Sequence, residues 1–327
     1  MFTHLEKYGW NSELQSEFEK HTAENPDLIP ARVFSVHRTN YELISENGEM
    51  VAEITGNRLK DTDPYSKPMV GDWVLVSLGD RDNANIIEYI MSRRTILERR
   101  RAHSETEIQI MATNVDVAVV VQSLAQDFNV NRLERVLTQL TDTGIQPLII
   151  LNKIDLIDDI STIHEQMKHL SNDVSVIYSS FQTGQGISEI HNMLQPGQTV
   201  VFIGSSGVGK SSIINTMLDE QQQQLTGEVS EWSGKGKHTT TARKLFLLDN
   251  GVIVIDTPGT REFGLTVDDE ILNQNFSQIE EIALGCKFRN CQHNTEPKCA
   301  IKQALVDGDI DQELLDNYHK LQKEVRK

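Results

Sequence analysis

The chain has 327 residues, of which 38% are hydrophobic, and its formal net charge is −17 at pH 7. This length allows two or three domains with a sizeable core. The composition excludes a disordered chain, and the acidic balance argues against nonspecific binding of nucleic acid. Because neither an N-terminal signal core nor a run of about 18 apolar residues is present, we expect a cytoplasmic protein.

Residues 1–28 form a mostly acidic extension with some helical character. In residues 29–104, five short runs are rich in β-branched and aromatic residues and predict strands: ARVFSVH, NYELIS, EMVAEIT, GDWVLVSL and ANIIEYIMS. Asn47-Gly48 is a hairpin signal between the second and third runs. Five such strands indicate a small β-barrel of the OB-fold type, although any small β-domain fits the same pattern.

A basic strip, RRTILERRR, follows these runs at residues 93–101. Such a strip can bind phosphate even on an acidic protein. Arg99, Arg100 and Arg101 are therefore candidate RNA contacts. A solvated strand end with some ion pairs is an equally open interpretation.

Strands alternate with helices in residues 105–283. The expected strands are VDVAVVVQS, PLIILN, VSVIYSS and TVVFIG, followed by KLFLLDNGVIVID, which reads as two strands joined at Asn250-Gly251. The expected helices are NRLERVLTQL, a polar segment near 160–170, ISEIHNML and KSSIINTML. The first helix carries an apolar face made of Leu133, Val136, Leu137 and Leu140. This alternation predicts a mainly parallel sheet with helices on both faces.

A glycine-rich loop, GSSGVGKS at residues 204–211, matches GxxxxGK[ST] between a strand and a helix. Its glycines allow backbone N–H groups to face phosphates, and the following helix adds its positive end. Lys210 would reach the β- and γ-phosphates, and the Ser211 hydroxyl would bind Mg²⁺. The predicted phosphate-binding set is Gly204, Ser205, Ser206, Gly207, Val208, Gly209, Lys210, Ser211 and Ser212.

The base is chosen by a second motif, Asn152-Lys153-Ile154-Asp155, which follows a strand. A carboxylate at Asp155 can accept both the N1–H and the N2–H₂ of guanine, whereas adenine would leave it unpaired. Such a mismatch discriminates by on the order of 10⁴-fold. Asn152 and Lys153 would frame the ring, and a backbone N–H at Ser179-Ser180 could meet guanine O6.

Two further segments have the features of nucleotide-dependent switches. Asp256-Thr257-Pro258-Gly259 ends a strand, so Asp256 would hold Mg²⁺ through water and the Gly259 N–H would sense the γ-phosphate. In SGKGKHTTT, Thr239 or Thr240 would bind Mg²⁺ only when GTP is present. The position of this loop between the two other elements favours a switch over a plain flexible loop.

The residue directly after this DxxG motif is Thr260, where many GTPases carry a glutamine that orients the attacking water. Threonine does not easily perform that task, so His238 is the best candidate for a catalytic replacement. A solvated loop histidine is about as well supported by the sequence alone.

The motif order NKID, SS, phosphate loop, HTT, DTPG is that of a circular permutation, in which the same sheet closes while the chain starts elsewhere. It ties residues 284–327 directly to the second switch. The ligand set there is Cys286, Cys291, His293 and Cys299, at spacings that fit one closed, structural Cys₃His zinc site. The alternative is three buried thiols and a surface histidine. Lys287, Arg289 and Lys298 could touch RNA.

Together these residues resemble the ribosome small-subunit-dependent GTPase A family (RsgA, also called YjeQ) over about residues 30–327. The resemblance is carried by FNVNRLERVL, NKID, GSSGVGKSS, GKHTTT, DTPGTREFG and the cysteine cluster. It implies an OB-fold, a circularly permuted GTPase domain and a C-terminal zinc-binding domain. It also implies a GTPase that binds the maturing 30S subunit and its 16S rRNA, is stimulated by that subunit, and uses His238 in hydrolysis.

We therefore expect a monomeric assembly factor of the 30S subunit that uses GTP, Mg²⁺ and one structural zinc ion. Two other interpretations stay open. The protein could be an RNA- or nucleoprotein-binding module whose affinity GTP regulates and whose turnover is incidental, or a GTPase that acts on another partner.

Overall fold

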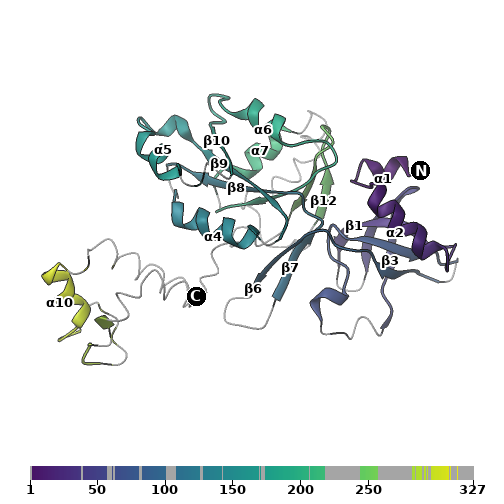
Figure 1. The fold of residues 1–327 in the computed structure, drawn as a ribbon, viewed down its shortest axis with the longest axis horizontal. Helices are drawn as coiled ribbons and strands as arrows, with labels where there is room; N and C mark the ends of the chain where they lie inside the picture. The colour runs from purple at the N-terminus through teal and green to yellow at the C-terminus, as the bar shows by residue number, and fades with distance from the viewer. Residues whose placement is uncertain are drawn as a thin grey trace. The chain divides into compact units, whose positions relative to one another are not determined.

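The computed structural model describes residues 2–37, 40–56, 61, 63–80, 83–100, 108–125, 128–141, 143–168, 170, 174–205, 207–217, 244–256, 282–283, 285–288, 291, 293, 296–308, 310 and 315. The chain divides into two compact units, residues 1–265 and residues 266–327, and each is described by itself (Figure 1). Among the described residues, no helix is long and apolar enough to cross a membrane.

The first unit contains the predicted five-stranded barrel, which follows the N-terminal extension. Its strands are β1 (Ile29–Val36), β2 (Tyr41–Ser45), β3 (Gly48–Glu53), β4 (Trp73–Ser77) and β5 (Asn85–Ile90). They pair in the order β1-β2-β3-β5-β4, and β4 pairs back with β1, so the sheet closes. Inward-facing residues of these strands form one buried core, which includes Ala31, Val33, Leu43, Val74 and Val76. The hairpin predicted between the second and third strands is present, but its two turn residues are Glu46 and Asn47, because Gly48 already pairs with Ser45.

The N-terminal extension packs on this barrel. It contains α1 (Thr3–Glu6) and α2 (Ser12–Thr22), and the side chain of Asn11 caps α2 by accepting the N–H groups of Glu13 and Leu14. The Trp10 ring meets Trp73 of β4 edge to face at 5.0 Å between centroids. Apolar side chains of the extension and the barrel thus form one buried cluster, which the acidic composition of the extension did not predict.

A second, two-stranded sheet was not predicted. It consists of β6 (Ile96–Arg100) and β7 (Ile108–Thr113), which pair antiparallel across the domain boundary expected at residue 104. The basic strip therefore runs into β6. The side chains of Arg99 and Arg100, and all of Arg101, lie outside the described residues.

The α/β part of this unit has the expected mainly parallel sheet. The strand order is β10 (Ser175–Ser179), β9 (Gln146–Asn152), β8 (Val117–Ser123), β11 (Thr199–Ile203), β13 (Ile253–Asp256) and β12 (Lys244–Leu247). Only β12 runs antiparallel to its neighbour within this part. The helices are α4 (Val130–Thr141), α5 (Ser161–Met167), α6 (Ile187–Met193) and α7 (Lys210–Thr216), with a short 3₁₀ turn, η2 (Ile154–Leu156).

Successive residues of the parallel strands face opposite layers. In β8, Ala118 and Val120 pack with Leu133 and Leu140 of α4, whereas Val119 belongs to the layer under α6 and α7. Figure 1 shows α4 on one side of the sheet and α6 and α7 on the other. The apolar face predicted for the first helix is thus the face it buries. Burial of each Val or Leu side chain contributes roughly 1.5–3 kcal/mol.

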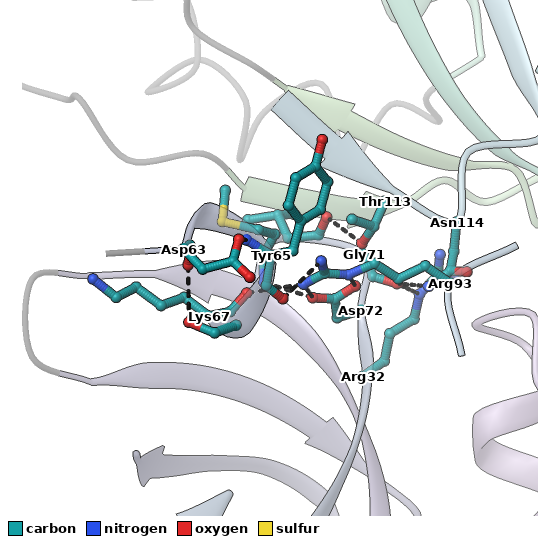
Figure 2. Close-up of polar contacts among 12 residues, drawn as sticks. Arg32, Asp63, Tyr65, Lys67, Gly71, Asp72, Arg93, Thr113 and Asn114 are labelled. Atoms are coloured by element: carbon teal, nitrogen blue, oxygen red, sulfur yellow. Dashed lines mark hydrogen bonds and ion pairs between the residues drawn. The ribbon is translucent and has the colours of Figure 1, made fainter. Parts of the chain in front are cut away.

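A buried polar network joins the barrel to the α/β sheet, and Figure 2 shows its part around Arg32, Asp72 and Arg93. The Arg32 side chain of β1 is 2% exposed, and it donates from Nη2 to Thr199 Oγ1 at 2.7 Å and from Nε to Gly71 O at 3.3 Å. Burial lowers the pKa of Arg32 to about 10. Beside it, Asp72 and Arg93 form a bidentate ion pair with N–O distances of 2.7 and 2.8 Å. The barrel is therefore anchored at the start of β11.

The second unit contains α10 (Ala300–Asp307) among its described residues. This helix starts directly after Cys299 and ends at Gly308, whose φ of 81° is the left-handed conformation that glycine favours. Its small core gathers the buried side chains of Cys299, Ile301, Ala304, Ile310 and Leu315.

Candidate functional site

The predicted nucleotide-binding elements meet at one edge of the sheet, although they are far apart in the chain. NKID follows β9, the serine pair ends β10, the glycine-rich loop follows β11, and Asp256 ends β13. These strands are parallel, so their carboxyl ends share an edge. Because β11 lies between β8 and β13, the permuted chain still places the glycine-rich loop at the centre of the sheet.

The glycine-rich loop needs glycine at two positions. Gly204 has φ 148°, and a Cβ there would lie 2.2 Å from Val121 O. Gly209 has φ 108°, and its Cβ would lie 2.2 Å from Asn152 Nδ2. Both contacts are with packed atoms of the sheet edge, so any larger residue would displace the loop.

Lys210 folds back over this loop. Its Nζ donates to Gly204 O at 2.7 Å and to Ser205 O at 2.6 Å. The ammonium group is therefore held at the mouth of the loop, where phosphate oxygens can replace these carbonyl groups as acceptors. Ser211 is partly buried on α7, Ser212 is exposed, and Ser206 lies outside the described residues.

Asn152 has a role that the sequence did not predict. It is 2% exposed, its Nδ2 donates to Val208 O at 2.7 Å, and its Oδ1 accepts from Ser179 Oγ at 3.2 Å. One side chain thus joins NKID, the serine pair and the glycine-rich loop. An asparagine at the end of a buried strand indicates a side chain that needs hydrogen-bond partners. The sequence could not identify these partners, because they lie 27 and 56 residues away.

The rest of NKID turns toward solvent. Lys153 has φ 65°, so the chain reverses sharply after β9 and enters η2. Ile154 is half-buried and Asp155 is exposed. The Asp155 carboxylate is therefore accessible to a base, as its predicted role requires.

Ser179 and Ser180 are fully buried at the end of β10. The Ser180 N–H donates to Gln185 O at 3.0 Å and closes a tight turn. At Gly186 a Cβ would lie 2.5 Å from Tyr178 O, so the turn requires glycine there. The Ser180 N–H, which the sequence offered as a donor to guanine O6, is therefore occupied by Gln185 O in this structure.

The two predicted switches adjoin β12 and β13. Lys244, the first residue of β12, is paired with Asp256, the last residue of β13. The chain therefore returns to the sheet at the edge that carries the glycine-rich loop. The Asp256 side chain, His238, Thr239, Thr240, Gly259 and Thr260 lie outside the described residues.

The four predicted metal ligands come together in the second unit. The ligand atoms of Cys286, Cys291, His293 and Cys299 all lie within 4.8 Å of one another. The Cys286 and Cys299 Sγ atoms are 3.9 Å apart, and His293 Nδ1 lies 3.4 Å from Cys299 Sγ. Zn–S bonds of about 2.3 Å in a tetrahedron separate two sulfur atoms by roughly 3.8 Å. The cluster is consistent with one zinc site.

The surroundings support this geometry. The Ala300 N–H, at the start of α10, donates to Cys286 Sγ at 3.3 Å, and a hydrogen bond of this kind orients a sulfur ligand toward a metal. His293 and Lys298 have φ values of 60° and 58°, which mark the sharp turns between ligands. Of the three basic residues that could touch RNA, Lys287 and Lys298 are described, whereas Arg289 lies outside the described residues.

Comparison with known proteins gives one consistent result. The family model described as RsgA GTPase matches residues 90–266. A protein of Listeria innocua named small ribosomal subunit biogenesis GTPase RsgA 1 is 40% identical, covering 98% of this chain and 89% of its own length. Small ribosomal subunit biogenesis GTPase RsgA 2 of Lactiplantibacillus plantarum is 41% identical over 99% of this chain and 90% of its own.

Among solved structures, the crystal structure of YjeQ from Thermotoga maritima is similar to this chain with a TM-score of 0.54 and 26% sequence identity. The match covers 91% of this chain and 98% of that one. It therefore extends over the barrel, the α/β sheet and part of the C-terminal unit.

Proposed function

The chain belongs to the RsgA GTPase family, and on that premise we propose that it hydrolyses GTP to GDP and phosphate as a late assembly factor of the small ribosomal subunit. The observation that carries the nucleotide site is the Asn152 side chain, which joins NKID, the serine pair and the glycine-rich loop. Elements separated in the chain thereby form one guanine-nucleotide site, as circular permutation requires.

We assign roles within this site as follows. Asp155 accepts the guanine N1–H and N2–H₂, and Lys210 binds the β- and γ-phosphates. Ser211 and Asp256 hold Mg²⁺, joined by Thr239 or Thr240 when GTP is bound. Gly259 senses the γ-phosphate, and His238 orients the attacking water.

We further propose that zinc occupies the Cys₃His cluster and is structural, because its four protein ligands leave no open position. The protein works in the cytoplasm as a monomer. Its partners are the 30S subunit and 16S rRNA, and Arg99, Arg100 and Arg101 of the basic strip contact RNA phosphates. The small-subunit role rests on the names of the relatives, which are 40% and 41% identical over nearly the whole chain.

The decisive experiment measures GTP hydrolysis by the full-length protein alone and with 30S subunits, 50S subunits or naked RNA. Strong stimulation by 30S alone supports an enzyme that acts as a timed switch in assembly. GTP-dependent binding to 30S without stimulation would favour an RNA-binding module with incidental turnover. No binding to 30S in either nucleotide state would point to another partner.

Replacing Asp155 by Asn should weaken GTP binding by on the order of 10²-fold or more, because hydrogen bonds to charged groups contribute about 1.5–3 kcal/mol each. The variant should instead favour XTP, since xanthine presents an acceptor where guanine has an amine. Calorimetry with GTP, XTP and ATP measures both effects. Asp158→Asn, which alters an exposed carboxylate three residues away, is the matched control. GTP affinity equal to that of the wild type in Asp155→Asn would exclude this base contact.

A further inference from the structure

The start of α4 is fixed to the sheet by side chains that the proposed function does not use. The Asn129 N–H donates to Gln122 Oε1 at 2.9 Å, and Gln122 Nε2 donates to Asn129 O at 3.2 Å. Gln122 lies on β8 and is 1% exposed. Asn129 Oδ1 in turn accepts the Arg132 N–H at 2.9 Å, which caps the helix. These bonds set the position of Arg132 on the first turn of α4.

From this position, Arg132 reaches the glycine-rich loop. Its Nη1 donates to Ser205 Oγ at 3.0 Å. The carbonyl oxygen of Ser205 accepts Lys210 Nζ at 2.6 Å. The second residue of the loop is thus held by two cations, one at its side chain and one at its backbone.

We propose that Arg132 is a positioning residue for GTP binding, which acts through Ser205 to hold the glycine-rich loop in the conformation that receives the triphosphate. The inference rests on the proposed function of this loop. Gly204, directly before Ser205, has φ 148°, a conformation that other residues rarely adopt, so the loop has little intrinsic tendency to keep this shape. An arginine fork on a fixed helix is a rigid donor and restrains the loop at the adjacent residue.

The charge of Arg132 adds to this effect. Arg132 carries a positive charge and is only partly exposed beside the loop. It therefore places a second positive charge next to Lys210 in a region less screened than open water. A nucleotide with more phosphate charge should gain more from it, so GTP should depend on Arg132 more than GDP does.

The test compares Arg132→Gln, Arg132→Lys, Ser205→Ala and the Arg132→Gln/Ser205→Ala double variant in the full-length protein. Arg132→Gln should raise the Kd of GTP about 10-fold, as expected for loss of a charged hydrogen bond, with a smaller effect on GDP. Arg132→Lys should restore part of the affinity. The double variant should bind GTP no more weakly than Arg132→Gln, because the two residues act as one unit.

Steady-state kinetics separate positioning from chemistry. Arg132→Gln should raise KM and leave kcat within about 2-fold, since the residue does not touch the reacting atoms. Arg135→Gln is the matched control: it removes the same charge from the same helix one turn later, and it should bind GTP like the wild type.

Lys210→Ala distinguishes failure of this inference from failure of the proposed function. If Lys210→Ala abolishes GTP binding while Arg132→Gln and Ser205→Ala bind GTP normally, Arg132 has no positioning role. Additive losses in the double variant would also overturn the link through Ser205. If Lys210→Ala itself binds GTP normally, the loop is not the phosphate site and the proposed function fails first.

Discussion

His238→Ala should bind GTP with nearly wild-type affinity and yet lose about 10²–10⁴-fold of its subunit-stimulated hydrolysis, the usual contribution of a group that orients or deprotonates the attacking water. Affinity should survive because the glycine-rich loop and NKID are unchanged. The reason to expect a role in hydrolysis is twofold. First, Thr260 stands where many GTPases have glutamine. Second, the segment that contains His238 leads to Lys244, which pairs with Asp256 at the sheet edge that carries the glycine-rich loop.

Single-turnover hydrolysis and calorimetry on the same preparation separate the two effects. Lys210→Ala should lose binding as well as turnover. His164→Ala, at an exposed histidine of α5, is the matched control and should behave as the wild type. Full stimulated turnover in His238→Ala would mean that the ribosomal subunit supplies the water-orienting group.

Cys291→Ser should release the metal and unfold the C-terminal unit while GTP binding continues. Structural zinc contributes on the order of 10 kcal/mol to the folding of small domains. The described core of this unit is small, and one of its members, Cys299, is itself a candidate ligand. Loss of a zinc ion bound by these ligands should therefore remove most of what stabilises the described part of this unit.

Metal analysis of the wild type should give about one zinc per chain, and limited proteolysis should cut Cys291→Ser within residues 266–327. Lys287→Ser, which alters the neighbour of a ligand, should retain zinc and protease resistance. If the wild-type protein contained no metal and residues 266–327 still resisted proteolysis, a structural zinc site would be contradicted.

The sequence by itself determined the chemistry of both candidate sites. Runs rich in β-branched and aromatic residues predicted the barrel strands, and the alternation of strands with helices predicted the mainly parallel sheet. The motifs GSSGVGKS and NKID predicted a guanine nucleotide, because their residue types match phosphate and guanine hydrogen bonds. The cysteine spacing predicted a Cys₃His metal site, and the four ligand atoms do lie within 4.8 Å of one another. These are local patterns, and each is complete within a few residues.

The tertiary structure alone decided how these parts are joined. The Arg32–Thr199 bond spans 167 residues, the Arg132–Ser205 bond spans 73, and the Asn152–Val208 bond spans 56. Neither β6 nor β7 was predicted. The residues of β6 lie within the basic strip, which was interpreted by its charge, and β7 is defined by its pairing with β6. The sequence predicted residues 1–28 only as an acidic extension with some helical character. In the structure, its aromatic and apolar side chains pack against the barrel. Long-range partners follow from strand order and packing, which no local pattern encodes, and they hold the permuted elements at one edge.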